Sequence, residues 1–225
     1  MKQTPIHEIH NAELLNLIPI NAKKIIEIGC SSGALAREYK KINANCEYIG
    51  IEIMTDYGDL AQRYCDQVII GDVESFPATF FSDNSDVDCW IFADVLEHLK
   101  DPWEILRKIS SVLINQGSVV ACIPNIQHWS VQSLISTGDF RYQDIGILDR
   151  THIRWFTRKT IIEMFEQNGF SIKDMWYRII TSDPRREQFL EKIASMASLA
   201  GANPDEAVKD AIPNQYIVLA TPKKA

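Results

Sequence analysis

The segment KKIIEIGCSSGAL (residues 23–35) decides the fold class. Its β-branched run ends at Gly29, and a helical pattern follows Gly33 through ALAREYKK. Two glycines in a tight strand-to-helix turn let the backbone approach a ligand closely. Their spacing is G-x-x-x-G, whereas turns that bind dinucleotides have the spacing G-x-G-x-x-G. The segment therefore predicts a strand, a ligand-binding turn and a helix, in that order.

Strand-like and helical segments continue to alternate after this point. Apolar strands separated by helices are typical of a parallel sheet covered on both faces, which is an α/β doubly wound fold. In such sheets ligands bind at the carboxyl ends of the strands. Two further strand-like runs come late in the chain. The predicted strands after the first are EYIGIEI, DQVIIGD, VDCWIFAD, GSVVACIP, SIKDMWYRII and NQYIVLAT.

Composition narrows the class of protein. Hydrophobic residues make up 46% of the 225 residues and charged residues 24%, as in ordinary globular domains. The formal net charge of −7 argues against a nucleic-acid partner or an anionic membrane surface, since both require basic surface. The sequence has neither a signal-peptide core nor an apolar run of ~20 residues. We therefore expect a soluble, cytoplasmic protein with five reduced thiols: Cys30, Cys46, Cys65, Cys89 and Cys122.

A single domain is expected over residues 1–225, because the chain has no linker long enough to separate two domains. Residues 1–20 are expected to form an N-terminal helical segment. Small helical cap elements are expected in two insertions, residues 125–156 and 184–212, beside the acceptor pocket. The amphipathic run RREQFLEKIASMASLA in the second insertion is interpreted as a helix that packs on the domain.

Three acids stand at the ends of the first three predicted strands. Glu27 lies beside the glycine turn, where it would repel a pyrophosphate but suits a positively charged amino group. Glu52 can accept hydrogen bonds from both hydroxyls of a ribose, and Asp72 from the amine of adenine, while Val73 offers the ring a backbone N–H. Each acid alone could be an ordinary loop residue. Together they describe an adenosine-bearing cation without phosphates, and S-adenosyl-L-methionine is the expected cofactor.

The segments EIGCSSGAL, GIEI, GDV and ADVLEHLKDP resemble, in this order, the signature segments of class I S-adenosylmethionine-dependent methyltransferases. The resemblance implies a mostly parallel seven-stranded sheet with a reversed last hairpin, which suits the two late strands. One departure is residues 30–32, where the family often has a further glycine. The expected cofactor-binding residues are Glu27, Gly29, Cys30, Gly33, Glu52, Ile53, Asp72, Val73, Ala93 and Asp94.

The loop after the fourth predicted strand carries Asp94, Glu97 and His98. In this family the loop faces the transferred methyl group. His98 could therefore accept the proton of an acceptor hydroxyl, with an acid orienting it. A second interpretation keeps all three residues structural. The catalytic candidates are His98, Asp94 and His152.

A third interpretation is a metal site. The pattern D-x-x-E-H is similar to the E-x-x-E-H of ubiquinone-pathway O-methyltransferases and small-RNA 2′-O-methyltransferases, where the resemblance implies bound magnesium. The RNA enzymes add a later histidine from a segment before a tryptophan, and THIRW supplies His152 here. Two imidazoles are a mild objection to magnesium, which prefers oxygen ligands. The hypothetical ligand set is Asp94, Glu97, His98 and His152.

Residues 125–156 combine aromatic, histidine and arginine side chains where this family builds its acceptor pocket. The combination PNIQHW and GILDRTHIRWFT is similar to the MetW group and to bacterial methyltransferases of polysaccharide systems. That resemblance implies a hydroxyl acceptor on a small molecule or glycan. The expected substrate-binding residues are His128, Trp129, Arg150 and His152.

Two other function classes compete with methyl transfer. A nicotinamide-dependent oxidoreductase shares the strand–turn–helix but conflicts with Glu27 and with the glycine spacing. A non-catalytic methyltransferase-fold partner, which binds cofactor or another protein, is the alternative that the sequence leaves open. The oligomeric state is open as well, and a homodimer is one option.

Overall fold

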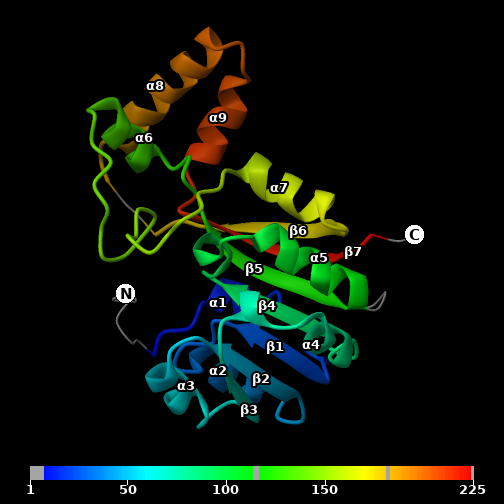
Figure 1. Cartoon of the computed structure of the whole chain (residues 1–225). Helices are drawn as coiled ribbons and strands as arrows, with labels where there is room; N and C mark the ends of the chain where they lie inside the picture. The colour runs from blue at the N-terminus through cyan, green and yellow to red at the C-terminus, as the bar shows by residue number, and fades with distance from the viewer. Residues whose placement is uncertain (1–7, 114–116, 181–182, 224–225) are drawn as a thin grey trace.

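The computed structural model describes residues 8–113, 117–180 and 183–223. A seven-stranded sheet in the order β3-β2-β1-β4-β5-β7-β6 runs through the molecule (Figure 1). The first five strands are parallel, whereas β7 is antiparallel to both β5 and β6. The predicted sheet with a reversed last hairpin is therefore confirmed. The strands are β1 (Lys24–Ile28), β2 (Glu47–Glu52), β3 (Gln67–Ile70), β4 (Cys89–Ala93), β5 (Ser118–Pro124), β6 (Phe170–Arg178) and β7 (Gln215–Pro222).

Alternate residues of a strand point to opposite faces of the sheet, and here both faces carry apolar side chains. Helices therefore cover both faces. Ile26 and Trp90 join one apolar core under α4, α5 and α7, and Ile25 and Ile91 join a second core under α1, α2 and α3. The doubly wound arrangement is thus confirmed. The covering helices are α1 (Ala12–Leu15), α2 (Ala34–Ile42), α3 (Thr55–Ala61), α4 (Ala78–Asp83), α5 (Pro102–Val112) and α7 (Arg158–Gln167).

Residues 8–20, the described part of the N-terminal segment expected to be helical over residues 1–20, are mostly not helical. Among its described residues only Ala12–Leu15 form a helix, and residues 1–7 lie outside the described part. Asn11 caps this short helix through its side chain, and a turn around Pro19 leads into β1. In the described part of the chain, no helix has both the length and the apolar content needed to cross a bilayer.

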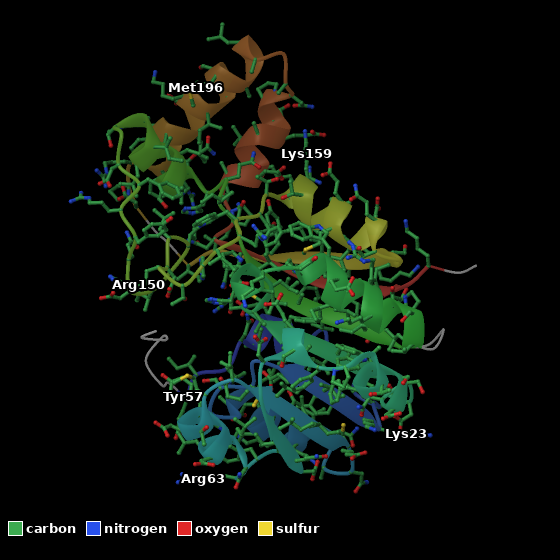
Figure 2. The ribbon with its side chains drawn as sticks, viewed as in Figure 1. Lys23, Tyr57, Arg63, Arg150, Lys159 and Met196 are labelled. Carbon is green, nitrogen blue, oxygen red and sulfur yellow. The ribbon has the colours of Figure 1, made fainter. Side chains whose placement is uncertain are left out.

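Three helices form a cap that stands away from the sheet (Figure 1). Their shared apolar cluster includes Trp129, Leu190 and Ile193, while Met196 projects from the outer side of α8 (Figure 2). They lie within the two segments expected as cap insertions. The helices are α6 (Trp129–Ser136), α8 (Arg186–Leu199) and α9 (Pro204–Ala211).

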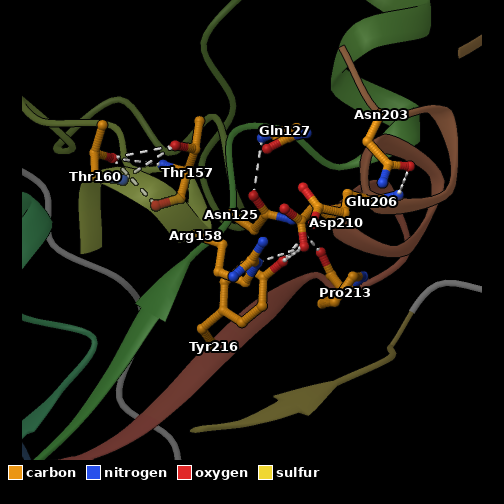
Figure 3. A network of polar contacts seen from close by, with 10 residues as sticks. All are labelled: Asn125, Gln127, Thr157, Arg158, Thr160, Asn203, Glu206, Asp210, Pro213 and Tyr216. Carbon is orange, nitrogen blue, oxygen red and sulfur yellow. Dashed lines mark hydrogen bonds and ion pairs between the residues drawn. The ribbon is translucent and has the colours of Figure 1, made fainter. Parts of the chain in front are cut away.

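A polar network joins this cap to the sheet (Figure 3). The buried side chain of Asn125, just after β5, donates to the carbonyls of Asp210 and Pro213 at 2.8 and 2.9 Å. The Asp210 carboxylate pairs with Arg158, at the start of α7, at 2.7 Å. Tyr216 on β7 donates to the same carboxylate at 3.4 Å. The network fixes the end of α9 over the ends of the central strands.

Candidate active site

A pocket of about 1200 Å³ opens at the carboxyl ends of the parallel strands. The ends of β1, β2 and β4 and the turn after β3 line one part of it, and residues 146–149 and 151–153 line another. Nine of the ten expected cofactor-binding residues line the pocket; Gly33 does not. The prediction that a ligand site would form at these strand ends therefore agrees with the position of the cavity.

The turn after β1 has a backbone that requires glycine. Gly29 has a φ of 73°, and a Cβ there would lie 2.4 Å from Cγ2 of Val95. Gly33 has a φ of 78°, and a Cβ there would lie 3.1 Å from the Cα of Ala61 on α3. The N–H groups of Gly29 and Cys30 both donate to the carbonyl of Ile51, at 2.8 and 3.1 Å. These bonds bind the turn to β2. Gly33 thus serves the packing of α2 on α3.

Glu52 holds the same turn through its side chain. It is buried, and its two carboxylate oxygens accept the N–H groups of Ser31 and Met54 at 2.9 and 3.0 Å. Ser31 has a φ of 49°, which is unusual for a residue other than glycine. The bond from its N–H to Glu52 helps to hold that conformation. Each oxygen keeps a further lone pair for a ligand.

Glu27 lies on β1 and is only 2% exposed. The hydroxyl of Tyr48 donates to its Oε2 at 2.9 Å. Burial raises the pKa of Glu27 to about 8, although the Tyr48 hydrogen bond opposes that shift. The carboxyl is therefore largely protonated at neutral pH until a cation reaches it.

Asp72 organises the turn after β3. Its carboxylate accepts the N–H of Glu74 at 2.9 Å and caps the short 3₁₀ turn η1 (Val73–Ser75). The Glu74 side chain then accepts the N–H groups of Lys100 and Asp101 at 3.0 and 2.8 Å. The loops that follow β3 and β4 are thereby joined on this side of the pocket.

Asp94 turns sharply out of β4, with a φ of 58°. Its Oδ1 accepts from the amide nitrogen of Gln215 and from the thiol of Cys122. The carboxylate thus contacts β5 and β7. Asp94 and Glu97, although three residues apart, therefore do not share a helical face. The helical turn is only η2 (Leu96–His98), and Asp94 lies before it.

Glu97, His98 and His152 form a compact cluster at the other side of the pocket. One ligand atom from each residue lies within 4.8 Å of the others, and the two imidazole centroids are 4.8 Å apart. Asp94 is not part of this group. Burial lowers the pKa of both histidines, so both imidazoles are neutral at pH 7.

Backbone hydrogen bonds bring the two histidine-bearing segments together. The N–H groups of Ile153 and Arg154 both donate to the carbonyl of Glu97 at 3.0 Å. Asp149 supports the preceding turn, since its carboxylate accepts from the N–H and the hydroxyl of Thr151 at 2.8 and 2.7 Å. These bonds fix His152 beside η2 although the two segments are far apart in sequence.

Three of the expected substrate-binding residues do not line the pocket. His128 is fully buried and caps α6, with its Nδ1 2.7 Å from the hydroxyl of Ser130. Trp129 stacks on Phe189 inside the cap. Arg150 is exposed on its loop and pairs with Asp144 (Figure 2). Of that set only His152 reaches the cavity, because helix packing and solvent exposure position the others.

Several pocket residues escaped sequence reasoning. Arg178, Asn214 and Gln215 come from the facing ends of β6 and β7, and their sequence context is that of ordinary strand ends. Their antiparallel pairing brings them to the carboxyl ends of the parallel strands. The reversed hairpin was the available signal, because it predicts that β7 begins where β5 ends.

Comparison with known proteins identifies the family. Residues 6–174 match the family model described as a methyltransferase domain. The chain belongs to this methyltransferase family. The expected class, a class I S-adenosylmethionine-dependent methyltransferase, is confirmed, and the MetW-like subtype stays a prediction. No curated protein matches the sequence.

Solved structures share the fold at low sequence identity. An S-adenosylmethionine-dependent methyltransferase of Thermotoga maritima is 14% identical, with a TM-score of 0.62 over 94% of this chain and 87% of that one. Magnesium protoporphyrin IX methyltransferase of Synechocystis, solved with S-adenosylhomocysteine, is 15% identical, with a TM-score of 0.58 over 94% and 80%. A candidate methyltransferase of Haloferax volcanii, in complex with the Trm112 methyltransferase activator, is 16% identical, with a TM-score of 0.61 over 94% and 88%. At these identities the likeness establishes the fold.

Proposed function

We propose that this methyltransferase transfers a methyl group from S-adenosylmethionine to a hydroxyl oxygen of a small-molecule or glycan acceptor. The observation that carries the proposal is a single cavity with two chemically different sides. Acids that suit an adenosine-bearing cation line one side, and the buried Glu97 and His152 with the half-buried His98 line the other. A reaction between two bound molecules needs such a juxtaposition.

The residues of the first side fit S-adenosylmethionine, which supplies the methyl group. Glu27 offers a buried carboxyl whose pKa is near 8, so a positively charged amino group would draw it into the ionised form. Glu52 already holds the turn and keeps lone pairs for the ribose hydroxyls. Asp72 and Val73 line the place expected for adenine.

The second side fits an acceptor hydroxyl. Its neutral imidazoles are suited to the removal of a proton, because they carry no proton on one ring nitrogen. Aliphatic side chains around them would contact the body of a small molecule and exclude water from the reacting atoms. Those lining residues are Val131, Leu134, Ile147, Leu148, Ile153 and Ile180.

The first test is calorimetric titration of the purified protein with S-adenosylmethionine and S-adenosylhomocysteine. We expect both to bind, and a screen with methyl-labelled donor should then find turnover of hydroxyl acceptors that His98→Ala abolishes while S-adenosylhomocysteine still binds. Cofactor binding without turnover of any hydroxyl compound would favour the non-catalytic partner protein. Absence of binding to either nucleoside would contradict the proposal at its first step.

The remaining expectations on partners stay predictions. The acidic net charge favours an acceptor other than nucleic acid and disfavours binding to an anionic membrane. A cytoplasmic location, expected from the reduced thiols, is a prediction as well. A homodimer is still an option. The MetW-like resemblance points to a small metabolite or a glycan precursor as the acceptor class.

A further inference from the structure

The carboxylate of Glu97 is buried without the hydrogen-bond donors that a buried acid usually has. The residue is 1% exposed, and neither carboxylate oxygen accepts a hydrogen bond from any residue that the structure describes. The Nε2 of His152 lies 3.8 Å from its Oε1. Buried carboxylates are ordinarily paired, hydrogen-bonded or bound to a metal ion. By contrast, both oxygens of the buried Glu52 have backbone donors. Among the described residues, Glu97 therefore lacks the hydrogen-bond donors that Glu52 has.

Both imidazoles of the cluster are oriented by the backbone. The Nδ1 of His98 lies 3.2 Å from the carbonyl of Thr151, and the Nδ1 of His152 lies 3.0 Å from the carbonyl of Ile147. A carbonyl only accepts hydrogen bonds, so Nδ1 carries the proton in each neutral ring. Nε2 is then the unprotonated nitrogen in both. Histidines that bind metals are commonly oriented in this way, with one nitrogen donating to a carbonyl and the other free to coordinate.

We infer that Glu97, His98 and His152 bind one divalent transition-metal cation through a carboxylate oxygen and two Nε2 atoms. One ligand atom of each residue already lies within 4.8 Å of the others, and the Nε2 of His152 lies 3.8 Å from Oε1 of Glu97, so small side-chain adjustments bring all three residues to one ion. Two nitrogens and one oxygen suit manganese, iron, cobalt or zinc better than magnesium, which prefers an oxygen shell. The site therefore contains three of the four ligands hypothesised from the sequence. The fourth, Asp94, accepts hydrogen bonds from Gln215 and Cys122 instead.

The part that this metal ion would play in catalysis rests on the proposed function, methyl transfer to a hydroxyl. Three protein ligands leave coordination positions open. The cluster lines the acceptor side of the pocket, so an open position is available to the acceptor oxygen. With the ion bound, both Nε2 atoms would be ligands, so the imidazoles would no longer take up the proton of the acceptor. The cation would instead lower the pKa of the coordinated hydroxyl, which would then lose its proton to water. The acceptor class expected from this chemistry is a molecule with two neighbouring oxygens, such as a catechol or a vicinal diol, which can chelate the ion.

The test uses the full-length protein after removal of metals with a chelator. Titration with Co²⁺ should give one equivalent of binding and visible absorption bands of nitrogen and oxygen coordination, and calorimetry should find Zn²⁺ binding at the same stoichiometry. Mg²⁺ should bind at least about 100-fold more weakly. Glu97→Gln and His152→Ala should each weaken Co²⁺ binding at least about 10-fold and change the absorption bands. His128→Asn is the matched control, because His128 is an equally buried histidine outside the cluster, and Co²⁺ binding should be unchanged.

Binding of S-adenosylhomocysteine to each variant separates loss of the metal site from loss of the fold. A protein that binds the nucleoside but neither Co²⁺ nor Zn²⁺ would overturn the metal inference and leave the proposed function standing. Co²⁺ binding that survives both Glu97→Gln and His152→Ala would also overturn it. Metal binding by these residues in a protein that methylates no hydroxyl would support the site and contradict the proposed function.

Discussion

The two sides of the pocket differ in whether their buried acids receive hydrogen bonds. On the cofactor side, Glu52 receives two backbone N–H groups and Glu27 one tyrosine hydroxyl. On the acceptor side, Glu97 is as deeply buried and its carboxylate receives none. A carboxylate with internal donors stabilises the protein that holds it, whereas one without them costs free energy until a ligand supplies the missing partner.

The acids of the cofactor side thus help to hold the fold, whereas the acid of the acceptor side is available to a ligand. On the cofactor side, Glu52 fixes the turn after β1 through a backbone N–H group, so the turn is formed before any ligand binds. The acceptor side keeps a polar group without a partner and two neutral imidazoles, an arrangement that proteins tolerate at functional sites. Substitutions on the two sides should therefore change stability and binding in different directions.

The largest effect is expected for Glu52→Ala. The change removes the partners of Ser31 and Met54 together with the expected acceptor of the ribose hydroxyls. We expect S-adenosylhomocysteine affinity to fall about 100-fold or more, which corresponds to about 3 kcal/mol. Glu47→Ala is the control, since Glu47 is exposed at the other end of the same strand. Calorimetry measures both, and equal affinities for the two variants would refute the cofactor assignment.

Gly29→Ala tests whether the two sides are packed against each other. An alanine there would adopt an unfavourable φ and place its Cβ 2.4 Å from Val95, a residue of the acceptor-side loop. We expect a loss of about 2–3 kcal/mol in the free energy of unfolding, from backbone strain and overpacking together. Denaturant titration provides the measurement.

Two controls divide that loss into its causes. Gly138→Ala carries a similar φ of 75° with no atom within 4 Å of the added Cβ, so it reports backbone strain alone. Val95→Ala in the Gly29→Ala background should recover the part due to overpacking. If the double variant is no more stable than Gly29→Ala, the contact between the two sides does not have the expected importance.

Sequence reasoning succeeded where position along a strand determines chemistry. Glu27, Glu52 and Asp72 were predicted to line the ligand site because each lies at or near the carboxyl end of a parallel strand, and all three do line the pocket. The alternation of strands and helices likewise predicted the doubly wound fold. Both features depend on short stretches of sequence, which is why they could be read directly.

The acceptor side was less predictable because its geometry depends on long-range contacts. His128 and His152 have similar sequence surroundings, yet one caps α6 and the other joins Glu97. The backbone bonds from residues 153 and 154 to the Glu97 carbonyl place His152 beside Glu97. The left-handed backbone of Asp94, which separates it from Glu97, has no sequence signal either.

Cofactor binding should release a proton from Glu27. With a pKa of about 8, the free carboxyl is mostly protonated at pH 7, and a cationic ligand requires it ionised. Affinity should therefore rise with pH between 6 and 7.5, by up to about tenfold per unit. Calorimetry of S-adenosylhomocysteine at pH 7, in buffers of different ionisation enthalpy, should detect release of close to one proton.

Two variants identify the source of that proton. Glu27→Gln should bind the nucleoside more weakly and release no proton. Tyr48→Phe removes the hydrogen bond that lowers the Glu27 pKa, so it should weaken binding at pH 7 about three- to tenfold and keep the proton release. Proton release that persists in Glu27→Gln would assign the titration to another group.

The smallest expected effect is a gain of stability, and it distinguishes the two sides most directly. Methionine at position 97 has a similar length and no buried charge, so Glu97→Met should stabilise the metal-free protein by about 1 kcal/mol at pH 7. Burial raises the pKa of the Glu97 carboxyl well above its ordinary value, and the nearby Asp94 charge adds to the shift. The folded state therefore binds more protons than the unfolded state above that value, and the penalty of Glu97 grows as pH rises. The gain should accordingly be larger at pH 8 than at pH 5 in urea unfolding. A loss of stability at both pH values would mean that Glu97, like Glu52, is an acid that the fold itself requires.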